Sequence, residues 1–380
     1  MKTKQGKDMQ NITYKKIIMM GTAAFMFSGC SKESDSFSIL SEQQQFAQSS
    51  NYLTRPIDIL WVVDNSGSMA TSQNQVASNF SSFITDFQSK GYDFKIAVGA
   101  TDAFAARHYN DNTRAKFKTG SGGDNTSTPI IIPSTPNLTN IFQRNIRVGV
   151  NGSGDERSLD SIRMILSNPL NSSFRRPGAY LSIIVVTDEE DYTHGDWWNG
   201  LTSYFSTAPE ASNWTWLQDP NRTKPALGLT PVSEFKSYLD GLTGGNDLQV
   251  SYSVSSIAVQ DATCKSTLET DGFGGRRIAG RVNELATLTG GQKLSLCGNF
   301  GTQLSLLTQK ILTGANTFRL NREPVVSTIV VTVNGSVVPQ SATNGWTYTA
   351  ANNSVVFNGN AIPPAGASIT IAFDPTGADF

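Results

Sequence analysis

An almost continuous apolar run, Ile57 to Val63, constrains the fold of this chain most strongly, because it ends directly in Asp64 and a tight turn. A strand that is apolar at nearly every position is typical of a parallel sheet covered on both faces. After the turn, apolar residues recur at helical spacing from Val76 to Phe87. This segment therefore predicts a strand followed by a helix, the repeating unit of an α/β fold.

The same alternation continues along the chain. Further strands are predicted over 94–99, 180–186, 250–259 and 293–296, and further helices over 141–148, 159–166, 235–242, 278–288 and 304–312. A long polar loop is expected over about 103–138, and an insertion rich in Trp, Tyr, Thr and Pro over about 192–230. We predict an α/β domain over 53–317, with a mostly parallel, Rossmann-like sheet and helices on both faces.

The pattern changes after residue 317. Short β-branched and aromatic runs follow one another, separated by turn signals such as Asn334-Gly335. Residues 318–380 are therefore predicted to form a small antiparallel β-sandwich, which would serve as a spacer or an auxiliary binding module.

The N-terminal residues have the pattern of a targeting signal. Five lysines precede an apolar run from Ile17 to Phe27. This run is shorter than the roughly 20 residues that a spanning helix needs, and it has the length of the apolar part of a signal peptide. It ends in Phe27-Ser28-Gly29-Cys30, which resembles the lipobox of bacterial lipoproteins.

This resemblance implies that a signal peptide, residues 1–29, is removed and that Cys30 becomes the lipidated N-terminus. An ordinary secretory signal with a chance cysteine is the alternative. Residues 30–52 are expected to be a flexible tether, because they are rich in Ser, Gln and Glu. By the same resemblance, Ser31 favours the outer membrane of a Gram-negative bacterium, so we expect a lipid-anchored protein of the cell envelope.

Cysteine usage agrees with export. Besides Cys30 the chain has Cys264 and Cys297. An even remainder in an oxidising compartment predicts one disulfide between them, with two buried free thiols as the alternative.

Charge and histidine content exclude several classes of protein. Lys plus Arg number 30 and Asp plus Glu number 31, so the net charge is −1. This balance argues against nucleic-acid binding. The only histidines are His108 and His194, which excludes a His-rich zinc site.

Oxygen ligands gather where the predicted strands end. Ligands of open α/β sheets bind beyond the carboxyl ends of the strands, and two of the best strands end in Asp64 and Asp188. Ser66 and Ser68 follow Asp64 over a turn that Gly67 permits, so their hydroxyls are expected to converge with the carboxylates. This hard oxygen set suits Mg²⁺, Ca²⁺ or Mn²⁺. The alternative is that Asp64 and the serines only cap a helix.

The segment Asp64-Asn65-Ser66-Gly67-Ser68 resembles the DxSxS element of von Willebrand factor type A (VWA) domains. The resemblance implies a Rossmann-like sheet with a metal-ion-dependent adhesion site (MIDAS), ligated by Asp64, Ser66, Ser68 and Asp188. The family's ligating threonine has no clean match here. We expect Ser153, in the loop 149–156, to take its place, with Glu156 as the alternative.

The neighbouring acidic residues have a less specific role. The segments 152–156, 188–191 and 278–297 resemble those of a group of VWA lipoproteins from Gram-negative bacteria. Glu189, Glu190 and Asp191 are expected to form a solvated acidic loop, with a second cation site as the alternative. His194 is expected to be a surface loop residue.

The sequence favours a non-enzymatic, lipid-anchored adhesion or scaffolding protein. An acidic side chain of a protein partner would complete the coordination of the bound ion. Trp197, Trp198, Trp214 and Trp216 are the candidate specificity surface, because aromatic residues are favoured in interface cores; a small core under a long loop is the alternative. The other functions considered are a metal-assisted hydrolase using Asp64, Asp188 and Glu189, and a chaperone-like subunit of an envelope assembly.

Overall fold

The structure is a computed structural model. It describes the backbone of Glu42–Phe46 and then residues 55–121, 123, 125–154, 156–193, 229–244, 251–320, 322–364 and 367–376. These residues belong to one compact unit, Leu40–Phe380. The predicted signal peptide and Cys30 lie outside the described residues. Within the described ranges, no helix is both long enough and apolar enough to cross a bilayer.

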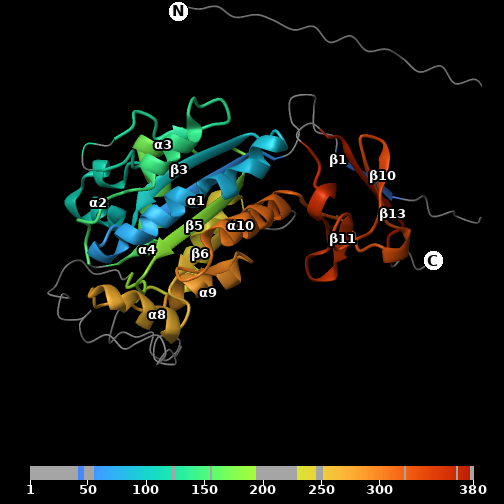
Figure 1. The fold of residues 1–380 in the computed structure, drawn as a ribbon. Helices are drawn as coiled ribbons and strands as arrows, with labels where there is room; N and C mark the ends of the chain where they lie inside the picture. Colours follow the sequence, from blue (N-terminus) through green and yellow to red (C-terminus); the bar gives the residue numbers. More distant parts are fainter. Residues whose placement is uncertain are drawn as a thin grey trace, which may run out of the picture. The chain divides into compact units, whose positions relative to one another are not determined.

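A six-stranded sheet forms the centre of the α/β region, in the order β4-β3-β2-β5-β6-β7 (Figure 1). Its strands are β2 (Ile57–Val63), β3 (Phe94–Ala100), β4 (Ile130–Ile131), β5 (Tyr180–Thr187), β6 (Tyr252–Ala258) and β7 (Lys293–Ser295). All neighbours pair in parallel except β4, which is antiparallel to β3. The predicted α/β fold class is confirmed, although β4 lies inside the segment expected to be a polar loop.

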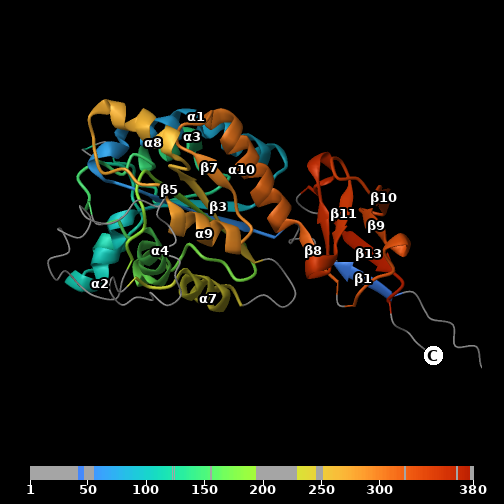
Figure 2. The ribbon, with the colours of Figure 1, turned by 90° about the horizontal axis from the view of Figure 1, so that it is seen from below.

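Helices cover both faces of this sheet (Figure 2). One face carries α1 (Ala70–Ser89), α3 (Leu138–Asn145) and α10 (Phe300–Ala315), and the other carries α4 (Ser158–Ser167), α7 (Val232–Thr243) and α9 (Gly280–Leu288). Trp61 and Val63 of β2 belong to the first core, and Leu60 and Val62 to the second. Because successive side chains of a strand point to opposite faces, a strand covered on both sides must be apolar at almost every position.

Aromatic side chains fill the space between β2 and its first layer of helices. The Trp61 ring lies 5.3 Å from that of Phe83 and 5.5 Å from that of Phe142, both edge to face. Such pairs add about 0.5–1.5 kcal/mol each beyond the area they bury. This packing holds the strand that ends in Asp64 firmly against α1 and α3.

Two small antiparallel sheets follow the α/β region, as predicted. One has the order β1-β13-β9-β10 and the other β11-β12-β8. The strands are β1 (Glu42–Phe46), β8 (Thr317–Arg319), β9 (Val330–Val333), β10 (Ser336–Val338), β11 (Trp346–Thr349), β12 (Ser354–Phe357) and β13 (Ile369–Phe373). Asn334 and Gly335 join β9 to β10 with positive φ at both positions, which is the turn that the sequence predicts.

The N-terminal side of the chain contributes one of these strands. Glu42–Phe46 forms β1 and pairs with β13, from Glu42 opposite Phe373 to Phe46 opposite Ile369. The prediction of a flexible tether over 30–52 is therefore wrong for these five residues. A Gln-rich segment can join a sheet because strand addition uses backbone hydrogen bonds, which its polar side chains do not prevent.

Candidate metal centre

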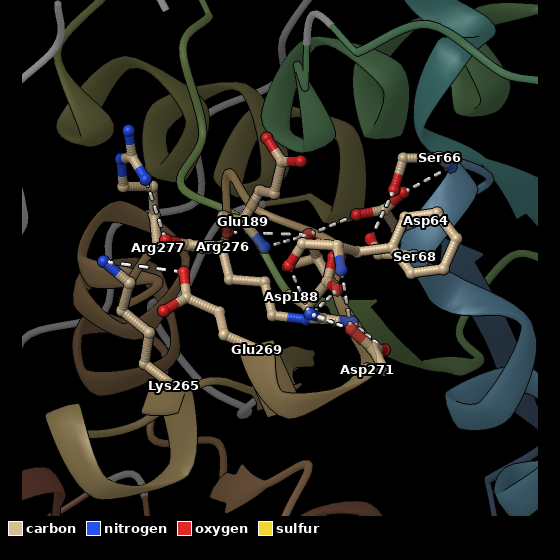
Figure 3. A network of polar contacts seen from close by, with 12 residues as sticks. Asp64, Ser66, Ser68, Asp188, Glu189, Lys265, Glu269, Asp271, Arg276 and Arg277 are labelled. Atoms are coloured by element: carbon tan, nitrogen blue, oxygen red, sulfur yellow. Dashed lines mark hydrogen bonds and ion pairs between the residues drawn. The ribbon is translucent and has the colours of Figure 1, made fainter. Parts of the chain in front are cut away.

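The carboxyl ends of β2 and β5 bring Asp64 and Asp188 to one edge of the sheet (Figure 3). Val63 pairs in register with Val186, and the backbone N–H of Asp64 donates to the carbonyl oxygen of Val186 at 2.8 Å. Each aspartate follows a fully buried strand directly. The predicted meeting of these two distant residues therefore follows from strand pairing.

The DxSxS turn orders its own oxygen atoms. The Asp64 carboxylate accepts the backbone N–H of Ser66 at 2.7 Å and the Thr187 hydroxyl at 2.8 Å. The hydroxyl oxygens of Ser66 and Ser68 lie 3.3 Å apart. Neither the 3₁₀ turn that starts at Gly67 nor α1 receives a side-chain capping bond, so capping does not explain the two serines.

Burial makes this cluster electrostatically costly. Removal from water raises the pKa of Asp64, and the charge of the nearby Asp188 raises it further. Burial also raises the pKa of Asp188, while Ser68 and Arg276 act in the opposite direction. Although Ser68 lies close enough to lower this pKa, Asp188 Oδ1 is buried without a hydrogen bond of ordinary geometry. The cluster therefore contains two buried carboxylates, one of which has an oxygen without an ordinary hydrogen bond.

The loop 149–156 is held against the DxSxS turn. Gln73 Nε2 donates both to the carbonyl oxygen of Asp64 at 2.9 Å and to that of Gly149 at 2.8 Å. The backbone N–H of Gly152 donates to the carbonyl oxygen of Asn65 at 2.7 Å. A Cβ atom at Gly152 would lie 2.3 Å from Asn65 Cγ, so a larger residue here would have to displace the Asn65 side chain.

The two candidate ligands on this loop have different environments. Ser153 is half-buried, whereas Glu156 is only 1% exposed. Burial raises the pKa of Glu156 well above its usual value, and the charges of Asp64 and Glu189 raise it further. The structure thus brings Glu156, the alternative ligand, into the acidic cluster.

The acidic run after β5 has three separate roles. Glu189 belongs to the cluster, since burial and then the charges of Asp64 and Asp188 raise its pKa. Glu190 accepts the backbone N–H groups of Gly280 and Arg281 at 2.9 and 3.0 Å, and so caps the first turn of α9.

Asp191 caps a second helix. Its carboxylate accepts the backbone N–H of Leu159 in α4 at 2.9 Å, the Thr193 hydroxyl at 2.7 Å and Arg281 Nε at 3.1 Å. Asp191 is fully buried and Glu190 nearly so. The expectation of a solvated acidic loop is therefore wrong, because the orphan amides of two helices bind these carboxylates.

Arg276 is the site residue that sequence reasoning missed. Its side chain is 2% exposed, and Nε donates to Asp188 Oδ2 at 2.9 Å. The two terminal nitrogens donate to the Asp271 carboxylate at 2.8 and 2.7 Å (Figure 3). A pair of arginines after a glycine-rich turn, within a segment enclosed by two cysteines, was the available signal.

The predicted disulfide is present. Cys264 and Cys297 are joined, with Cα atoms 5.6 Å apart, and the segment between them contains both Asp271 and Arg276. The disulfide thus links the two ends of the segment whose Arg276 side chain binds Asp188.

Two other observations limit what can be said of the site. Among the described residues, no group of three or more His, Cys, Asp or Glu side chains has the arrangement of a metal site. The oxygen donors are instead a mixture of carboxylates and hydroxyls. The predicted specificity surface (Trp197, Trp198, Trp214 and Trp216) and His194 lie outside the described residues.

Comparison with known proteins gives only distant likenesses. No protein-family model matches the chain, and no curated protein matches it. The pilus adhesin RrgA of Streptococcus pneumoniae is 9% identical, covering 88% of this chain and 60% of that one, with a TM-score of 0.32. Proximal thread matrix protein 1 of the mussel byssus is 11% identical over 72% of this chain and 51% of its own, with a TM-score of 0.35.

The pilus tip protein Mfa5 of Porphyromonas gingivalis is 12% identical, over 86% of this chain and 63% of its own, with a TM-score of 0.34. The chain spans between half and two thirds of the length of these three proteins. Similarity at this level does not extend to particular residues or to function.

Proposed function

We propose that the chain binds a divalent cation through Asp64, Ser66, Ser68 and Asp188 and uses it to hold a protein partner. The observation that carries this proposal is the burial of two carboxylates beside two hydroxyls at one sheet edge, with Asp188 Oδ1 lacking a hydrogen bond of ordinary geometry. A buried carboxylate without a counter-charge costs several kcal/mol, and Arg276 compensates only one of the two directly. A bound Mg²⁺, Ca²⁺ or Mn²⁺ ion would supply the missing positive charge and an open coordination position.

We further propose that an acidic side chain of the partner takes this open position, as in a MIDAS of the VWA type. The resemblance of the DxSxS turn and the position of Asp188 at the end of β5 support this assignment. The tryptophan-rich insertion would then form the contact surface around the ion. The protein would act in adhesion or scaffolding, without breaking covalent bonds.

The proposed location is the cell envelope, with Cys30 as the lipid anchor in the outer membrane. The lipobox-like segment supports the anchor. The disulfide supports an oxidising compartment, where such bonds persist.

Affinity capture from membranes tests this function. The full chain is incubated with solubilised envelope proteins in Mg²⁺ or Ca²⁺, with Asp64→Ala and with EDTA in parallel. Asp111→Ala is the matched control, because the Asp111 carboxylate is exposed and contacts Thr113 and Arg114. We expect a partner with the wild type and the control only; capture that survives both EDTA and Asp64→Ala would contradict the proposal.

A further inference from the structure

A glycine-rich turn, residues 271–276, lies beside the candidate metal centre. The Cε1 atom of Phe273 is 3.7 Å from the position that a Cβ atom would take at Gly67, in the DxSxS segment. A Cβ atom at Gly275 would lie 3.9 Å from Glu189 Oε1. The turn therefore lies against both the DxSxS segment and the acidic run that follows β5.

The Phe273 side chain in this turn remains 51% exposed. Cβ atoms at Gly272 and Gly274 would meet no atom of the described residues within 4 Å, their direct chain neighbours aside. Single exposed apolar side chains are common on protein surfaces and usually need no explanation. This one combines open space on both flanks with a position beside the proposed binding site.

The backbone of Phe273 is fixed on both sides. Its N–H donates to Asp271 Oδ1 at 2.9 Å, and its carbonyl oxygen accepts Arg276 Nη1 at 2.8 Å. Arg276 in turn binds the Asp271 carboxylate and donates from Nε to Asp188 at 2.9 Å (Figure 3). The turn is thus anchored to the sheet edge where β5 ends.

A fixed, exposed aromatic side chain is a favourable anchor for a partner. Aromatic residues are enriched in the cores of interfaces, where a few side chains supply most of the binding energy. Because Asp271 and Arg276 already order the turn, little further freedom is lost when a partner covers the ring. A purely structural role would instead favour burial of the ring.

We propose that Phe273 is the apolar anchor of the partner-binding surface, and that the partner presents a large apolar side chain two residues from its acidic side chain. This inference rests on the proposed function, because the acidic side chain is the one that binds at the candidate metal centre. The Phe273 ring lies against Gly67, between Ser66 and Ser68, so one short extended segment can reach both. In such a segment, side chains two residues apart point to the same side and are roughly 7 Å apart.

A synthetic peptide array tests this inference. Each nine-residue peptide has Asp, Glu or Ala at its centre, one varied residue two positions before or after it, and Gly and Ser elsewhere. The full chain in detergent is applied with Mg²⁺ and Ca²⁺ or with EDTA, as wild type, Phe273→Ser and Leu170→Ser. Leu170→Ser is the matched control, because Leu170 is 53% exposed and lies in a different element, Pro169–Asn171.

We expect wild type and Leu170→Ser to bind acidic peptides with Phe, Leu or Ile at the varied position about tenfold more tightly than those with Gly. Phe273→Ser should reduce this preference to less than about twofold and still require the acidic residue. Its thermal midpoint should stay within about 2 °C of that of wild type, because the ring is half exposed. A much larger fall would assign the ring to core packing and overturn the inference.

The array separates this inference from the proposed function. Wild type that selects acidic peptides without an apolar preference, or Phe273→Ser that keeps the preference, would overturn the inference and leave the proposed function standing. Wild type that selects no acidic peptide, or binds equally well in EDTA, would overturn the proposed function and this inference with it.

Discussion

Replacement of Arg276 by Met should reveal how strongly the acidic cluster depends on the buried guanidinium group beside Asp188. Methionine retains much of the apolar stem and removes the guanidinium group. Both side chains of the 2.9 Å Arg276–Asp188 ion pair are 2% exposed. The variant would therefore leave the Asp188 carboxylate buried without this partner. Breaking a buried pair from one side costs about 3–5 kcal/mol.

The second ion pair of Arg276 contributes much less to this loss. Asp271 is 42% exposed, and pairs of this kind are worth about 0–1 kcal/mol. Asp271→Asn is therefore the matched control, since it removes the exposed pair and keeps the buried one. We expect Arg276→Met in EDTA to lose about 3–5 kcal/mol of unfolding free energy, and the control about 1 kcal/mol or less.

Urea denaturation followed by tryptophan fluorescence measures both values at fixed ionic strength. Saturating calcium should raise the unfolding free energy of Arg276→Met by more than that of wild type, because the cation is then the main positive charge next to Asp188. A loss in Arg276→Met no larger than in Asp271→Asn would refute the view that Asp188 is buried at a cost.

Three further predictions concern the surroundings of the site. Reduction of the Cys264–Cys297 disulfide should lower the unfolding free energy by roughly 3–4 kcal/mol, from paired urea melts with and without reductant; an unchanged midpoint would contradict this. Burial raises the pKa of Glu190 from 4.5 to about 8, so stability in EDTA should fall as pH rises from about 4.5 to about 8. Glu190→Gln should flatten this profile, and an equally steep one would exclude Glu190 as its source. Gly152→Ala should cost about 1–3 kcal/mol in a thermal melt, because its Cβ would meet Asn65, and full stability would show that the loop yields.

The parallel strands were predictable because burial on both faces leaves its mark within the sequence of the strand itself. A strand buried on both faces needs continuous apolar sequence, and β2 and β5 have it. β4 has only two residues, and β1 is Gln-rich, so neither carries such a signal. Their pairing depends on the free edges of β3 and β13, which the sequence of the added strand does not encode.

The same distinction applies to the site. Asp64 and Asp188 were predictable because both follow apolar strands and strand ends meet at one edge. The partners of Arg276 and Glu190 were not, because their bonds join residues 88 to 91 positions apart through loops and helix ends. From sequence alone an acidic run predicts a solvated loop. In the fold, backbone N–H groups distant in sequence bind the carboxylates of Glu190 and Asp191, and both are buried.

The metal content of the full chain, purified from membranes without chelator, tests the central claim most directly. Mass spectrometry of the metals in wild type and Asp64→Ala would be compared at equal protein concentration. We predict about one divalent cation per wild-type chain, and none above background in the variant. A wild type without bound cation, or an Asp64→Ala variant that keeps it, would contradict the assignment of this sheet edge as a metal centre.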